Sequence, residues 1–291
     1  LNKTAGKFVF SEKKSNIPNG DVALASKILS FTKKIDIYYK NLNLNKQCEI
    51  SGEWKNELLR KRRNQELSYR SENIELIASF HERMFYNELI SGLWNFGHLK
   101  NGKCSFFSSL LFINDLNNYE KIFPNCKYLY SNIPLPFWGG LKKNQLIKFT
   151  DTLHATCSNH LSDLSNFFKN NRNNSDISLI EIGSGFGGLA EKIFRHKLFN
   201  NIFLFDIPHN LLTAYYYLGR CFEKEDVLLI DNINDFRKFL KTEKNKIFLI
   251  PTCFYELNQE IEEQCILANF GSFSEMDFTS IEYYVEKMNK K

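Results

Sequence analysis

The sequence predicts an α/β fold, in which a parallel sheet covered by helices follows a mainly helical N-terminal region. Three observations predict it. Residues 177–182 form an apolar run that leads directly into a glycine-rich turn, as expected for a strand buried on both faces. After this turn, short apolar runs alternate with segments of helical spacing. Before it, in residues 21–85, apolar residues recur mainly at helical spacing.

Composition limits the classes of protein to consider. The chain has 291 residues, which is enough for one large domain or two smaller ones. Its net charge of +5 is weak evidence for a polyanionic partner. No apolar run approaches the roughly 18 residues of a membrane span. The seven cysteines form no C-x-x-C pair, which favours reduced thiols in a cytoplasmic protein and disfavours a metal site. No nucleic-acid-binding motif is present.

The N-terminal half offers few chemical signals. We expect a helix from Asp21, acting as N-cap, with an apolar stripe through residues 22–35. Residues 60–63 are four consecutive basic residues, which favour a solvated helix face over a phosphate clamp. His81 lies on an apolar helical face and is predicted to be a packed histidine. Residues 134–140 form an aromatic-rich loop that either stacks on a ligand or connects elements.

The glycine turn carries the strongest signal in the chain. Gly183 and Gly185 allow a sharp turn and a close approach of backbone to ligand. Apolar spacing then indicates a helix from near Gly187. A strand, a glycine turn and a helix N-terminus together are typical of a nucleotide-binding βα unit.

Two ligands compete for this turn. Gly183-x-Gly185-x-x-Gly188 fits a dinucleotide fingerprint, and Asp206 follows at about the spacing of its ribose-binding acid, roughly 20 residues on. Glu181 argues against this ligand, because a carboxylate there would repel a pyrophosphate. S-adenosylmethionine has no phosphate and carries two positive charges, so a nearby carboxylate suits it. A glycine turn without a ligand is the third alternative.

Further strands are predicted at residues 201–205, 227–230, 247–251 and 264–269, with a helix around residues 236–240. Asp206, at the end of the second strand, is placed to accept hydrogen bonds from both ribose hydroxyls, with Ile207 beside the adenine. Its alternative role is the N-cap of the next helix, which would have Pro208 in its first turn.

The run Glu181-x-Gly183-x-Gly185-x-Gly187 resembles the first motif of class I S-adenosylmethionine-dependent methyltransferases. Residues 185–190, 205–218 and 269–276 resemble one branch of that superfamily, the bacterial sugar O-methyltransferases. The resemblance spans residues 150–280. It implies a Rossmann-like methyltransferase sheet in residues 151–291, preceded by a helical region, residues 1–150, that binds or covers the acceptor. The cofactor-binding residues would be Glu181, Gly183, Ser184, Gly185, Phe186, Gly187, Asp206 and Ile207.

The resemblance also implies a function, the methylation of a sugar hydroxyl in surface polysaccharide biosynthesis. In this superfamily the loop after the fourth strand faces the methyl group, so Asn269 and Ser272 would bind the acceptor. Glu275 and His209 are the leading candidates for the catalytic base, and His154 and His160 are further ones. The family's sheet continues beyond the point that Lys291 reaches, so we expect an incomplete sheet.

Three alternatives stay open at this stage. Ser272-x-x-Glu275 is also a capping box that would begin a helix through Ile281. The chain as a whole could be a nicotinamide-dependent oxidoreductase. It could also be a module that binds a cofactor or partner without turnover.

Overall fold

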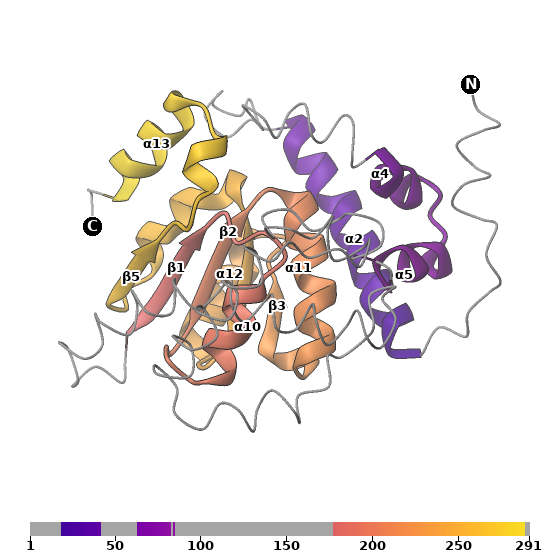
Figure 1. Cartoon of the computed structure of the whole chain (residues 1–291), viewed down its shortest axis with the longest axis horizontal. Coiled ribbons are helices and arrows are strands. Elements are labelled where there is room, and N and C mark those ends of the chain that lie inside the picture. The colour runs from indigo at the N-terminus through magenta and orange to yellow at the C-terminus, as the bar shows by residue number, and fades with distance from the viewer. Residues whose placement is uncertain (1–18, 42–62, 83, 85–176, 289–291) are drawn as a thin grey trace, which may run out of the picture.

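The structure is a computed structural model that describes residues 19–41, 63–82, 84 and 177–288 (Figure 1). Helices precede a region in which strands and helices alternate. The elements are α2 (Asn19–Asn41), α4 (Arg63–Arg70), α5 (Ile74–Glu82), β1 (Ser178–Ile182), α10 (Gly188–Arg195), β2 (Ile202–Asp206), α11 (Pro208–Cys221), η2 (Lys224–Asp226), β3 (Val227–Leu229), α12 (Ile233–Thr242), β4 (Ile247–Pro251), η3 (Thr252–Glu260), β5 (Cys265–Ala268), η4 (Ser272–Glu275) and α13 (Phe278–Met288).

The five strands form one sheet in the order β3-β4-β2-β1-β5, and every pair is parallel. The predicted α/β class is therefore confirmed for the described residues, and the arrangement is consistent with a Rossmann-like fold. Strands β1, β2 and β4 are buried throughout, as their apolar sequences predict for strands covered on both faces. The predicted strand boundaries agree with the observed ones to within one residue at each end.

The strand order determines which helices cover each face. The connections β1–α10–β2 and β2–α11–β3 run in one direction across the sheet, and those through α12 and η3 run back. Because such crossovers are right-handed, α10 and α11 cover one face, while α12 and η3 cover the other. The contacts agree, since α10 packs on α11 and α12 packs on η3. Phe203, Phe236 and Phe248 form an aromatic cluster under α12.

The N-terminal helices pack directly on α11, and α2 runs beside it in Figure 1. Gly219 allows this approach, because an added Cβ would lie 2.8 Å from Cδ2 of Leu24. His81 stacks on Tyr216 with the ring centroids 5.2 Å apart, and its Nε2 lies 3.0 Å from the Tyr69 hydroxyl. The prediction that His81 is a packed histidine is confirmed.

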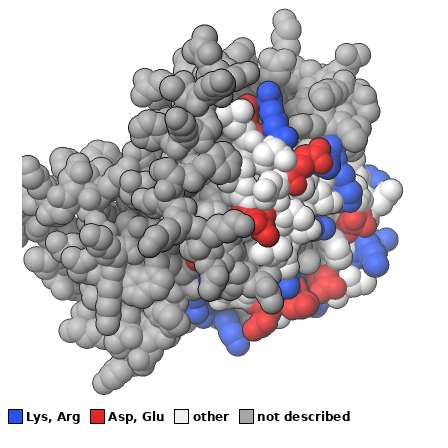
Figure 2. Space-filling view, turned by 90° about the vertical axis from the view of Figure 1, so that its right-hand side faces the viewer, with Lys and Arg blue, Asp and Glu red and all other residues white. Residues whose placement is uncertain are grey.

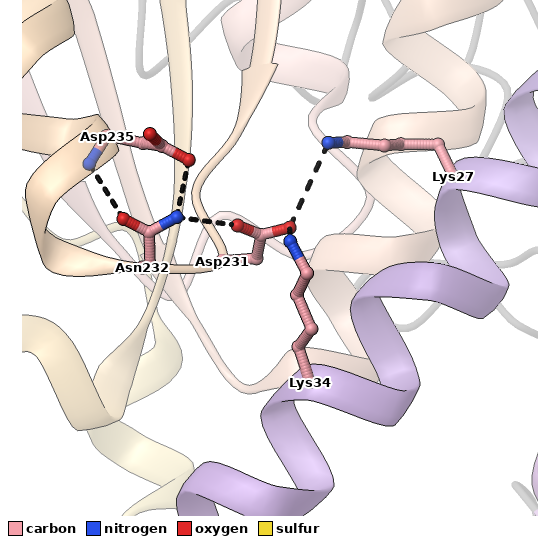
Figure 3. Close-up of polar contacts among 5 residues, drawn as sticks. All are labelled: Lys27, Lys34, Asp231, Asn232 and Asp235. Carbon is pink, nitrogen blue, oxygen red and sulfur yellow. Dashed lines mark hydrogen bonds and ion pairs between the residues drawn. The ribbon is translucent and has the colours of Figure 1, made fainter.

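Ion pairs also attach α2 to the sheet (Figure 3). Asp231, buried just beyond β3, lies between two lysines of α2: its Oδ2 is 2.9 Å from Nζ of Lys34 and 3.9 Å from Nζ of Lys27. The amide of Asn232 donates to the other carboxylate oxygen over 3.1 Å. Asn232 is also the N-cap of α12, accepting the backbone N–H of Asp235. One short segment thus holds α2 and begins α12.

One sequence prediction is corrected here. Helix α2 begins at Asn19, so Asp21 lies inside the helix and is not its N-cap. Strand β5 is the fifth strand in chain order, as predicted, and pairs with β1. Residues 60–62, His154, His160, the loop 134–140 and the proposed boundary near residue 150 lie outside the described residues.

The described parts carry mixed charge on the face drawn in Figure 2. On the face drawn in Figure 2, acidic and basic side chains are interspersed over the described residues, and neither sign forms a separate patch there. No helix within the described ranges combines the length and the hydropathy that a bilayer span requires.

The anchor of α2 can be tested by substitution. We expect Asp231→Asn to lower the free energy of unfolding by about 1–2 kcal/mol, because the change removes the buried carboxylate that pairs with Lys34. Glu72→Gln is the matched control, since its pair with Lys33 (2.6 Å) also involves α2 but is exposed. That change should cost less than about 0.5 kcal/mol. If urea denaturation shows the same loss of unfolding free energy for Asp231→Asn and Glu72→Gln, the Asp231 ion pair does not anchor α2.

Candidate functional site

The carboxyl ends of three neighbouring strands meet at one edge of the sheet. Strand β1 lies between β2 and β5, and its glycine turn is flanked by the segments that follow those two strands. The crevice outside the carboxyl ends of such parallel strands is the usual ligand site of an open α/β sheet. Gly183, Asp206 and Asn269 therefore mark one candidate site, built from three separate stretches of sequence.

The turn has the backbone geometry that only glycine adopts easily. Gly183 and Gly185 have φ angles of 77° and 59°, and an added Cβ at Gly183 would lie 2.0 Å from Oγ of Ser272. Among the described residues, apart from its two chain neighbours, no atom lies within 4 Å of the Cβ position at Gly185, so they leave space open there. Gly187 is the N-cap of α10, and the predicted helix start is confirmed.

Two carboxyl groups are buried beside this turn. Glu181 is 4% exposed and Asp206 is 5% exposed. Glu181 pairs in register with Leu204, so it faces the same side of the sheet as Asp206, two residues further along β2. Burial, and secondarily the charge of Asp206, raise the pKa of Glu181 to about 8. Its Oε2 atom is buried and has no hydrogen-bond partner among the described residues.

Asp206 ties the end of β2 to the glycine turn. Its Oδ2 accepts the backbone N–H of Gly185 over 2.7 Å. Its Oδ1 accepts the N–H of Ile207 over 2.7 Å and the side-chain amide of Asn210 over 2.9 Å. The N-cap of α11 is Ile207, with Pro208 in the first turn, so the alternative assignment of Asp206 as N-cap is wrong. Sequence analysis missed Asn210, although its position four residues after Asp206, in the first turn of a predicted helix, was a usable signal.

The other predicted cofactor residues also lie at this turn. The Oγ atom of Ser184 is buried without a hydrogen-bond partner in the described part of the chain. Phe186 is buried, and its ring packs on Tyr217 with the centroids 5.1 Å apart, so it supports the turn from the side of α11. Ile207 is half-buried directly after Asp206. Within the part of the chain that the structure describes, the turn thus combines unpartnered polar atoms with an apolar support.

The predicted acceptor residues link the segment after β5 to the end of β1. The Asn269 amide and the Ser272 hydroxyl both donate to the Ile182 carbonyl, over 2.9 and 3.0 Å. The capping-box assignment is wrong, because Ser272 and Glu275 bound the short helix η4, whereas α13 begins at Phe278. Asp277 accepts the N–H of Ser280 there and takes the capping position.

The two leading candidates for a base lie on opposite sides of β1. Glu275 is half-buried in η4, after β5, whereas His209 lies in the first turn of α11, after β2. The Nε2 atom of His209 is 3.7 Å from the Glu66 carboxylate of α4. Strand order therefore places the two candidates after strands on either side of β1. Sequence analysis also missed Glu66, because nothing local to it indicates a contact with α11.

No family model, no curated protein and no solved structure matches the chain. Within the described ranges, no group of three or more His, Cys, Asp or Glu side chains could hold a metal ion. The geometry of the glycine turn and the resemblance of its residues to the methyltransferase motif are therefore the observations that bear on function.

The contact between Gly183 and Ser272 gives a first test. Gly183→Ala should cost about 3 kcal/mol, because a left-handed φ and a displaced Ser272 both add to the free energy of the folded state. Gly185→Ala is the matched control and should cost about 1 kcal/mol, since it meets only the φ penalty. In a double-mutant cycle, Ser272→Gly should remove most of the difference. Equal costs for both alanines in urea denaturation would refute the close contact.

The buried Glu181 predicts a pH dependence of stability. Its pKa is about 8 when folded and 4.5 as an ordinary carboxyl, so the folded protein binds more protons between these values. Its contribution to the free energy of unfolding is present below pH 4.5 and is lost as pH rises through 8, by roughly 5 kcal/mol at most. Glu181→Gln should abolish this loss. Glu260→Gln, at an exposed ion pair, is the control. If the free energy of unfolding, measured in urea, depends on pH in the same way for wild type and Glu181→Gln, a buried and protonated Glu181 is excluded.

Proposed function

We propose that the chain binds S-adenosylmethionine at the glycine turn and transfers its methyl group to a hydroxyl oxygen. The observation that carries the proposal is the buried carboxyl of Glu181, one oxygen of which has no hydrogen-bond partner among the described residues, beside a glycine turn where those residues leave space. A buried carboxylate is costly unless a positive charge lies near it. A cationic ligand at this turn would supply that charge, whereas a pyrophosphate would add negative charge next to Glu181 and Asp206.

The residues present fit this cofactor. Glu181 would face its positively charged end, and Asp206 would accept a hydrogen bond from one ribose hydroxyl, since a carboxylate has about four lone-pair sites and the donors from Gly185, Ile207 and Asn210 use three of them. Gly183 and Gly185 would let the backbone approach closely, and Ile207 would lie beside the adenine. S-adenosylmethionine supplies a methyl group on a positively charged sulfur, which is a good leaving group.

The chain's own task is then to align a hydroxyl and to remove its proton. Alignment at short range supplies much of the rate of such a reaction. A base is needed because a protonated hydroxyl is a poor nucleophile. We propose Glu275 for this role, because it follows β5, which adjoins β1, and is half-buried. His209 is the weaker candidate, since it faces Glu66 between helices. Asn269 and Ser272 would hold the loop that carries Glu275.

The acceptor we propose is a sugar hydroxyl, in the synthesis of a surface polysaccharide. This part of the proposal is supported by the resemblance of residues 185–190, 205–218 and 269–276 to sugar O-methyltransferases. Analysis of glycans for a methyl group that disappears when the gene is deleted would test it separately from cofactor binding.

Calorimetry tests the cofactor with a signature that depends on Glu181. Binding of S-adenosylmethionine at pH 7 should release most of one proton, because a carboxyl with a pKa of about 8 is mostly protonated before the cation binds. The release is measured as the dependence of the binding enthalpy on the ionisation enthalpy of the buffer. Affinity should rise with pH up to about 8.

Glu181→Gln should bind at least tenfold more weakly and release no proton, while Glu260→Gln should behave as the wild type. Tight binding of NAD with no binding of S-adenosylmethionine would instead establish the oxidoreductase alternative. Cofactor binding without methylation of any sugar nucleotide or glycan in a panel would favour a non-catalytic module.

A further inference from the structure

A cavity lies between α2, α4 and the first turn of α11, and none of its lining residues belongs to the glycine turn. Its volume is about 130 Å³. Such a cavity can hold one six-membered ring, because a cavity of about 150 Å³ accommodates benzene. Most of its wall is apolar and comes from all three helices, namely Phe31, Ile35, Tyr69, Pro208 and Leu212.

Polar side chains lie on one part of this cavity. Glu66, Arg70 and His209 line it, and the Glu66 carboxylate is 3.7 Å both from Nη2 of Arg70 and from Nε2 of His209. The neighbouring imidazole of His209, together with the charge of Arg70, lowers the pKa of Glu66 although burial opposes the shift, so this carboxylate is ionised at neutral pH. The other ring nitrogen of His209, Nδ1, is buried and has no hydrogen-bond partner among the described residues.

The cavity wall is held in place by contacts outside the cavity. Phe31 lies between Lys27 and Lys34 in α2, and both lysines pair with Asp231 (Figure 3). On the opposite side, Gln65 donates to the Tyr69 hydroxyl over 2.6 Å and to the His209 carbonyl over 3.3 Å. The cavity is therefore largely preformed, as binding sites for small molecules usually are.

We propose that this cavity binds a small neutral ring that carries hydroxyl groups. The opposite charges of Glu66 and Arg70 balance, so a charged ligand would gain little from the pair. A carboxylate requires a hydrogen-bond donor and a guanidinium requires an acceptor, and a hydroxyl group serves as both. The apolar wall would contact the face of the ring. This site is additional to the proposed cofactor site, and ligand binding there does not require the cofactor.

The test is ligand-detected NMR on the full chain without cofactor, with myo-inositol, methyl glucoside, phenol and toluene as separate probes. The wild type should bind at least one hydroxylated ring in the millimolar range. Thr32→Trp, which fills the cavity from its edge, should weaken binding at least tenfold. Lys33→Trp is the matched control on the same helix, since Lys33 is exposed and pairs with Glu72, and should change affinity less than twofold.

A second variant keeps the test informative if Thr32→Trp does not fold. Glu66→Gln removes the carboxylate charge with little change in size. It should weaken binding of the hydroxylated ring about fivefold and leave the affinity for toluene unchanged. Binding of inositol or the glucoside identifies a sugar-like ligand, and binding of phenol alone identifies an aromatic one. Binding of toluene alone, no binding at tens of millimolar, or equal affinity of wild type and Thr32→Trp would overturn the proposal. Calorimetry with S-adenosylmethionine on the same samples tests the cofactor site separately.

Discussion

The parallel pairing of β1 with β2 on one side and β5 on the other is the constraint on which the site depends. Because all these strands run in the same direction, their carboxyl ends lie at one edge of the sheet, and the segments that follow them meet there. Asp206 then reaches the N–H of Gly185, and Ser272 packs against Gly183. A change of register by one residue would turn Glu181 and Asp206 to opposite faces of the sheet.

The same constraint has an electrostatic consequence. Two carboxyl groups are buried on one face of the sheet, and the fold offers Oε2 of Glu181 no hydrogen bond within the described residues. Glu181 therefore resists ionisation, and the folded protein loses stability as this group is forced to ionise. Such a cost is tolerated most readily where a ligand offsets it, which is why a buried acid with a raised pKa beside open space indicates a binding site.

The N-terminal helices belong to the same packed core as the sheet. Leu24 contacts Gly219, His81 stacks on Tyr216, and Asp231 pairs with lysines of α2. These contacts fix α2 and α5 against α11, while Gln65 of α4 donates to the His209 carbonyl, and a cavity with both apolar and polar walls is left between α2, α4 and α11. Because His209 and Asn210 are consecutive residues of α11, the helix that lines this cavity also holds Asp206.

The sequence by itself determined the strands, the glycine turn and the places of Glu181 and Asp206, because buried strands, left-handed turns and helix starts depend on residues only a few positions apart. Only the tertiary structure decided that β4 lies between β3 and β2, that Ser272 packs on Gly183 rather than capping α13, and that Asp231 meets Lys34. These features join residues far apart in the chain, and Asp231 and Lys34 are 197 positions apart. Such contacts form because strand pairing and helix packing bury both partners together, and no periodicity within either segment encodes its partner.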